Sequence, residues 1–240
     1  MMADEIGIYF DRIRRRGPTK RDALVHRARS QLLRKSEMSL SKPVTVLVNG
    51  IESDVLITNK PDNNEKELML LNGTLKAGSV IEWNDSHWLV MDTDKNDVLY
   101  SSGTINRCNY ILKFRNNKQE LIQKYCIITD VTKYLIGEAW KSMMTIGDSR
   151  MSLAIPRDRD TAALKRGMRF LIDDPIAEEI CAYEITKPDR VTNVYEGHGI
   201  YKFLCREVNS SDTDNKAELI PDNSEYQPGE PDGTENGGWF

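Results

Sequence analysis

Residues 75–91, LKAGSVIEWNDSHWLVM, decide the fold class of this sequence because their pattern occurs twice. A Leu-Lys-x-Gly turn leads into two short apolar strands. The same turn returns at residues 164–167, 89 positions later in the chain. The second copy continues into an alternating strand at 168–172 and another at 183–186. Apolar and polar residues that alternate between turn residues are typical of small antiparallel sheets.

Each copy is expected to close on an aromatic-rich strand, residues 109–114 in the first and 200–205 in the second. The spacing between elements differs by several residues from one copy to the other. Two unrelated β meanders would also share glycine turns and aromatic strands. The sequence therefore leaves open whether the two β modules arose by duplication.

The N-terminal part predicts two helices, residues 4–16 and 19–36, separated by Gly17-Pro18. Thr19 stands at an N-cap position, and Asp22 follows three residues later, as in an acidic capping box. Leu24, Ala28 and Leu32 form an apolar stripe on the second helix. This segment is too short and polar to make its own core, so we expect it to dock on a neighbouring subunit or ring.

Asn49-Gly50 follows the apolar run 44–48, and this dipeptide predicts a two-residue type I′ hairpin turn. The fold class is mainly β, with two consecutive small antiparallel β-barrel or sandwich modules, an N-terminal helical arm and a disordered acidic tail. The expected divisions are a basic helical arm at 1–40, β modules at 41–118 and 119–208, and a flexible tail at 209–240.

Charge is polarised along the 240 residues, although the net charge is only −4. Residues 12–35 carry ten Lys and Arg against the single acid Asp22, whereas residues 207–240 carry nine acids against Lys216. Such asymmetry indicates either electrostatic partners at one or both ends of the chain or simple solvation of charged segments, and solvation is favoured for the acidic tail. The candidate residues for contact with a partner or DNA are arginines of the arm: Arg14, Arg15, Arg16, Arg21, Arg27 and Arg29.

No motif for catalysis, cofactor binding or metal binding is present in the sequence. The histidines are isolated, at positions 26, 87 and 198, and no two of the four cysteines form a CxxC pair. Phosphate-binding glycine loops and nucleophile-elbow motifs are also absent. We therefore expect a protein that is not an enzyme, with no cofactor, no metal and reduced cysteines. No apolar run is long enough for a membrane span or an export signal.

Several short strings resemble the head-closure proteins of long-tailed bacteriophages, over roughly residues 40 to 220. In the first module the likeness rests on the run from Gly78 to Trp83, on Trp88-Leu89-Val90 and on residues 108–114. In the second it rests on the strings 153–156, 169–173, 183–187 and 213–215. The chain is larger than a minimal stopper protein, because a second module and a helical arm are added.

The resemblance implies a structural virion protein of the head–tail connector, or neck, assembled in the bacterial host cytoplasm. It would form a homo-oligomeric ring between a portal or adaptor ring and the tail proteins, closing the DNA-filled head and presenting a docking surface for the tail. Contact with packaged DNA would be non-specific, and no membrane would be involved. Ring order and the connector layer stay open.

Two other classes compete with this interpretation. A nucleic-acid-binding β-barrel protein would use the basic N-terminal arm, since cationic helices contact phosphates and small barrels stack bases on aromatic residues. A tail-associated hydrolase is the third class, and the search for motifs gives it no support.

Overall fold

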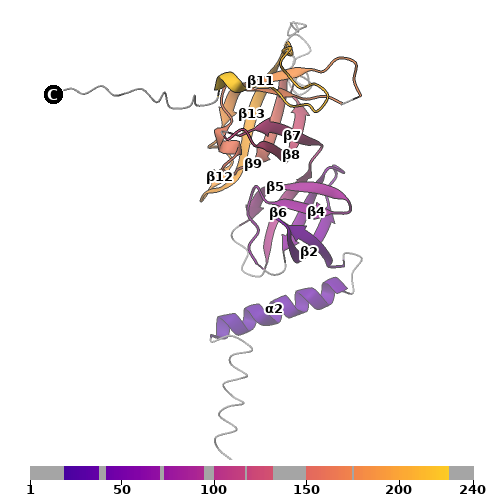
Figure 1. Ribbon diagram of the computed structural model, residues 1–240. Coiled ribbons are helices and arrows are strands. Elements are labelled where there is room, and N and C mark those ends of the chain that lie inside the picture. The colour runs from indigo at the N-terminus through magenta and orange to yellow at the C-terminus, as the bar shows by residue number, and fades with distance from the viewer. Residues whose placement is uncertain are drawn as a thin grey trace, which may run out of the picture. The chain divides into compact units, whose positions relative to one another are not determined.

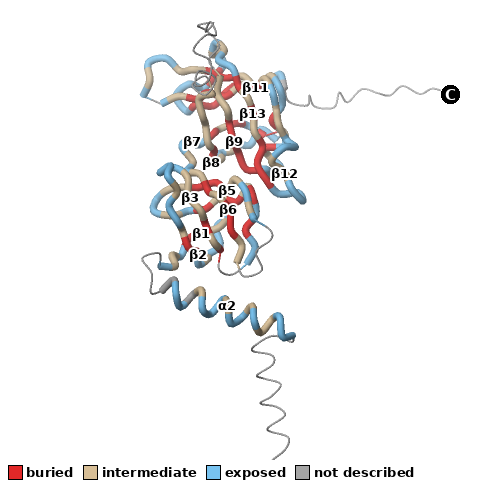
Figure 2. The backbone as a smooth tube through the Cα atoms, turned by 180° about the vertical axis from the view of Figure 1, so that it is seen from behind, coloured by how far each residue is buried: buried red, intermediate tan, exposed pale blue. Residues whose placement is uncertain are grey.

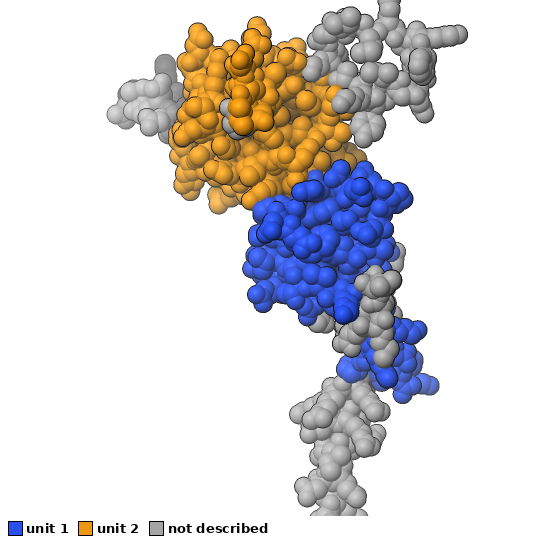
Figure 3. Space-filling view, turned by 90° about the vertical axis from the view of Figure 1, so that its right-hand side faces the viewer, with its two compact units in different colours: residues 1–107 blue, residues 108–240 orange. Residues whose placement is uncertain are grey.

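The computed structural model describes residues 19–37, 42–70, 73–94, 100–116, 118–131, 150–174 and 176–226. The chain divides into two compact units, residues 1–107 and 108–240, which Figure 3 distinguishes by colour. The architecture is mainly β: an N-terminal helix, a closed barrel in the first unit and a nearly closed barrel in the second (Figure 1). The predicted fold class is thus confirmed.

Helix α2 spans Lys20–Glu37 and begins with the predicted capping box. The backbone N–H of Asp22 donates to Thr19 Oγ1 at 3.1 Å, and the backbone N–H and hydroxyl of Thr19 donate to Asp22 Oδ2 at 3.1 and 2.7 Å. These reciprocal bonds satisfy donors that the first turn leaves free. The helix predicted at residues 4–16 lies outside the described residues.

The first barrel is a closed sheet in the order β1-β2-β3-β6-β5-β4, with all neighbours antiparallel. Its strands are β1 (Val44–Val48), β2 (Ile51–Asn59), β3 (Glu65–Leu70), β4 (Val80–Trp83), β5 (Ser86–Asp94) and β6 (Ser101–Arg107). Asn49 and Gly50 have φ of 50° and 79° and join β1 to β2, which confirms the predicted hairpin turn. Asn84 and Asp85 make a second turn with two positive φ angles, 47° and 53°, between β4 and β5.

The second barrel repeats this order as β7-β8-β9-β13-β11-β10. Its strands are β7 (Tyr110–Arg115), β8 (Leu121–Asp130), β9 (Arg150–Pro156), β10 (Arg169–Leu171), β11 (Ala182–Asp189), β12 (Val194–Tyr195) and β13 (His198–Val208). The short strand β12 pairs only with β13 and is an addition to the common pattern. Figure 2 shows the buried residues gathered along the strands of both units.

The two copies of the Leu-Lys-x-Gly turn have the same backbone hydrogen bonds. Gly78 N–H donates to Val90 O at 2.8 Å and Val90 N–H donates to Ser79 O at 2.9 Å. In the second unit, Gly167 N–H donates to Ile185 O and Ile185 N–H donates to Met168 O, both at 2.9 Å.

The irregularities of the two sheets also match. A break in register follows Val90 in β5 and Ile185 in β11, at the same place in each barrel. Strand order, turn and bulge therefore correspond, and the strand register identifies equivalent positions in the paired strands of the two barrels.

The seam between the first and last strands distinguishes the two barrels. In the first, Val48 of β1 pairs with Ile81 of β4, so the sheet closes. The register makes Phe114 of β7 and Phe170 of β10 their equivalents, and these rings meet edge to face with centroids 6.4 Å apart. Two phenylalanine rings thus stand at the seam where β7 and β10 are not paired as strands.

Side chains bridge the open seam of the second barrel. The hydroxyl of Tyr110 on β7 donates to the backbone oxygen of Leu171 at 3.0 Å, and Asp173 N–H donates to the same hydroxyl at 3.3 Å. Asn223, far along the chain, holds the free edge of β10: its Oδ1 accepts from Arg169 N–H at 2.8 Å and its Nδ2 donates to Arg169 O at 2.9 Å. In the first barrel Asn49 holds the equivalent residue, Val80, through its Oδ1 and its backbone N–H, both at 2.8 Å.

The segment that carries Asn223, residues 209–226, is folded onto the second unit. The carboxylate of Asp214 is fully buried and lies 3.2 Å from the guanidinium of Arg169. It also accepts the backbone N–H groups of Ser211 and Asp222 at 2.7 and 2.8 Å. Leu219 and Ile220 are buried, and Leu219 packs against Leu171.

Two boundaries and one strand assignment expected from the sequence need correction. The division between modules falls at residues 107 and 108 rather than at 118, because β7 pairs with β8 of the second unit. Residues 109–114 are thus the first strand of the second barrel, and the equivalent of residues 200–205 is β6. The flexible tail does not begin at 209, since residues 209–226 are packed; residues 227–240 lie outside the described part.

Candidate interaction surfaces

Side chains that could act in catalysis or metal binding are scattered in the described part of the chain. Within those residues no group of three or more His, Cys, Asp and Glu side chains is arranged to hold a metal ion. No described helix is long and apolar enough to cross a membrane. That the protein lacks a cofactor and is not an enzyme stays a prediction.

All four cysteines are free thiols, as expected from the sequence. Burial raises the pKa of Cys108 and Cys205 to about 12, and it raises the pKa of Cys126 as well. Burial and then a hydrogen bond with Asp173 raise the pKa of Cys181 to about 11. Because the thiolate is the nucleophilic form, these cysteines are poor candidates for covalent catalysis at neutral pH.

The basic helix α2 carries three of the candidate arginines. Arg21, Arg27 and Arg29 are exposed, whereas Arg14, Arg15 and Arg16 lie outside the described residues. No described side chain of α2 is buried, as Figure 2 shows, and Leu24 of the predicted apolar stripe is 56% exposed. The helix therefore offers both charge and apolar surface.

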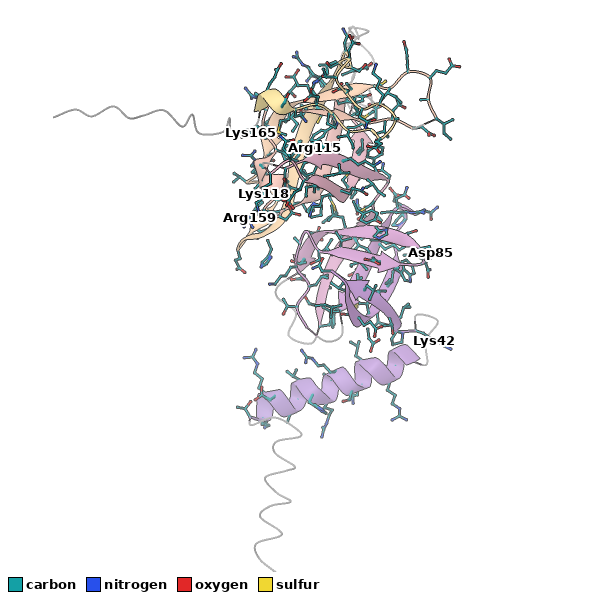
Figure 4. The ribbon with its side chains drawn as sticks, in the orientation of Figure 1. Lys42, Asp85, Arg115, Lys118, Arg159 and Lys165 are labelled. Carbon is teal, nitrogen blue, oxygen red and sulfur yellow. The ribbon has the colours of Figure 1, made fainter. Side chains whose placement is uncertain are left out.

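A second cationic surface, not predicted from the sequence, lies on the second unit. The turn between β7 and β8 and the connection between β9 and β10 lie side by side, since Asn116 Nδ2 donates to Asp160 Oδ1 at 3.4 Å. These segments expose six basic side chains, Arg115, Lys118, Arg157, Arg159, Lys165 and Arg166, of which Figure 4 labels Arg115, Lys118, Arg159 and Lys165. These basic residues are spread over about 50 positions of sequence, so they form no continuous basic run from which the surface could be predicted.

The connection between β10 and β11 is much longer than its equivalent in the first barrel. Residues 172–181 replace the two-residue turn Asn84-Asp85, and Ile176 within them is 89% exposed. The carboxylate of Asp173 ties the loop ends together by accepting Asp174 N–H at 2.9 Å and Cys181 N–H at 3.0 Å. Partial burial opposes ionisation of Asp173, but these backbone donors lower its pKa below the ordinary value.

A second extension of this barrel leads from β11 through β12 to β13. Val191 is 81% exposed there, and Tyr195 is also exposed. The carboxylate of Asp189 accepts the N–H groups of Val191 and Thr192 at 3.1 and 3.0 Å, and the hydrogen bonds from Thr192 and Val191 lower its pKa to about 2. Neither extension could be predicted from the sequence, because both stand out only when the two barrels are compared.

Residues 22–107 match the family described as the YomX N-terminal domain. The matched region starts inside α2 and ends at the last residue of the first unit, so it contains the helix together with the closed barrel. No curated protein matches the chain. No solved structure matches it either.

Proposed function

We propose that this protein is a structural subunit of the head–tail connector of a long-tailed bacteriophage. In this role it forms a ring that closes the DNA-filled head and presents a docking surface for the tail. The resemblance over residues 40 to 220 supports assembly into a connector ring. The described residues include exposed surfaces that are suited to contacts between subunits of such a ring.

The repeated barrel is the observation that carries this proposal. The second barrel follows the first strand for strand and adds two extensions, which carry the protruding side chains of Ile176 and Val191. Loops on a rigid scaffold are where binding residues concentrate. Cyclic assembly would bury such side chains and stabilise two small modules.

Electron microscopy tests this proposal most directly. Purified protein imaged in negative stain, alone and mixed with a portal or adaptor ring, should give rings of a fixed number of subunits. Gold-labelled antibodies against the protein should mark the neck of phage particles. Particles that carry no label at the neck, together with the absence of any ring, would contradict the connector role.

A nucleic-acid-binding role is the second candidate, and the two exposed cationic surfaces favour it. Phosphate contacts of this kind are independent of sequence and weaken steeply with salt. Duplex DNA binding should therefore be measured at several salt concentrations for the wild type and for a variant with Arg14, Arg15 and Arg16 replaced by Ala. Tight binding by the free monomer at physiological salt would favour this role over the connector.

A further inference from the structure

Helix α2 presents an apolar side chain between two cations. Leu24 is 56% exposed, and the exposed residues Arg21 and Arg27 stand three positions before and after it. Residues three apart share one face of a helix, so all three side chains belong to a single surface. The capping box at Thr19 and Asp22 stabilises the first turn, next to this surface.

The loop between β10 and β11 presents the opposite charge close in sequence to an exposed apolar side chain. Ile176 is 89% exposed, and exposed acids stand on both sides of it: Asp174, Glu178 and Glu179. Residues 172–181 contain no Lys or Arg. One side of this loop is anionic around an apolar tip, as one side of α2 is cationic around Leu24.

Hydrogen bonds hold the acidic loop in place before any partner binds. Asp174 Oδ1 accepts the backbone N–H of Ile176 at 3.0 Å, and Asp174 O accepts Ala177 N–H at 2.9 Å. The hydroxyl of Tyr110 and the carboxylate of Asp173 anchor the base of the loop. A loop ordered in advance loses less conformational entropy on binding.

We propose that α2 of one copy docks on the β10–β11 loop of a second copy. Leu24 contacts Ile176, while Arg21 and Arg27 face the acids that flank it. Each copy offers both the cationic helix α2 and the acidic β10–β11 loop, so the contact is heterologous and closes into a ring when the rotation between copies allows. This inference rests on the proposed role in a ring and names the surfaces that form it.

Sedimentation equilibrium of the full chain at low salt tests the contact. A helix variant with Arg21→Glu and Arg27→Glu, and a loop variant with Glu178→Lys and Glu179→Lys, should each lower the association constant by about tenfold or more. Mixing the two variants should restore association, because each then offers a complementary partner. Lys118→Glu with Arg159→Glu is the matched control, and it should leave association unchanged.

Circular dichroism establishes first that each variant is folded. A wild type that stays monomeric at about 1 mM, above the Kd of most specific contacts, would overturn the contact. So would association that all charge reversals leave unchanged, or mixed variants that fail to associate. Rings that persist in every variant would remove this contact but leave the connector role intact. A helix variant that loses DNA binding alone would favour the nucleic-acid role.

Discussion

The two barrels share one strand order but close in different ways. In the first, backbone pairing between β1 and β4 seals the sheet, with small side chains, Val48 and Ile81, at the seam. In the second, Phe114 and Phe170 occupy the equivalent positions, and the seam is bridged by Tyr110 and by the segment 209–226. Side-chain volume at two positions thus accompanies the change from a self-contained barrel to one that needs a distant part of the chain.

This difference also bears on function. A barrel closed by its own backbone needs no further segment, and the YomX N-terminal domain match covers such a unit with its helix. The second barrel carries the added loops with Ile176 and Val191 and depends on polar contacts for closure. We expect partners to be recognised mainly on the second unit, with the first unit contributing α2.

The largest expected effect of a single change falls on the second barrel. Asp214→Ala removes a buried carboxylate and leaves Arg169, which is only 21% exposed, without its charged partner. Breaking a buried ion pair from one side costs several kcal/mol, and we expect about 3 kcal/mol here because Arg169 retains some solvent. Hydrogen exchange measured by mass spectrometry should show faster exchange in β10 and β11 and no change in β1–β6. Equal destabilisation of both barrels would contradict the division.

The addition of a methyl group, in place of the removal of a side chain, should destabilise only the first barrel. A Cβ added at Gly103 of β6 would lie 2.3 Å from the backbone oxygen of Asp92. The equivalent position in the second barrel is Phe203, which is buried there. Gly103→Ala should therefore cost about 1–3 kcal/mol by overpacking. Urea unfolding and hydrogen exchange should place the loss of stability in the first unit. An unchanged stability of the Gly103→Ala variant would show that Gly103 is not packed against Asp92 as tightly as the structure indicates.

Two asparagines give a matched pair with smaller effects. Asn223→Ala removes both side-chain bonds to Arg169, and we expect a loss of about 2 kcal/mol in the second unit. Asn49→Gly removes the side-chain bonds to Val80 and Ser79 but keeps the backbone bond to Val80 O and the positive φ. We expect about 1 kcal/mol in the first unit, measured by chemical denaturation of each variant. A larger loss of stability for Asn49→Gly than for Asn223→Ala would contradict this ranking.

The smallest expected effect is the pH dependence of the turn at Asp189, which precedes the added strand β12. Hydrogen bonds from Thr192 and Val191 lower the pKa of Asp189 from 3.8 to about 2. The depressed pKa means that the carboxylate stabilises its turn above pH 3.8, and this contribution is lost as the pH falls towards 2. An NMR titration should give a midpoint near 2 for Asp189 and a parallel shift of the Thr192 amide. A midpoint near 3.8 would show that the turn is not held by this carboxylate.

Local features were predictable because neighbouring residues determine them. The Asn49-Gly50 turn, the Thr19 cap and the paired glycines 78 and 167 each follow from backbone preferences within a few residues. Of the candidate site, the exposed arginines of α2 could be predicted in the same way.

Long-range features were predicted poorly. Strand β6 (Ser101–Arg107) contains one large apolar residue, Ile105, so the more apolar β7 was assigned to the first module in its place. The segment 209–226 was expected to be flexible because it is polar, but the four donors around buried Asp214 and the burial of Leu219 and Ile220 order it. Two of these donors belong to Arg169, 45 positions before Asp214, and composition does not reveal such long-range bonds.

The central claim is that the second barrel, unlike the first, is completed by residues 211–226. Two truncations test it: a chain that ends after Ser210 and a matched control that ends after Tyr226. Hydrogen exchange should show that the longer chain protects both barrels as the full chain does. The shorter chain should lose protection in β10 and β11 while β1–β6 stay unchanged. Full protection of β10 and β11 in the chain that ends at Ser210 would contradict the claim.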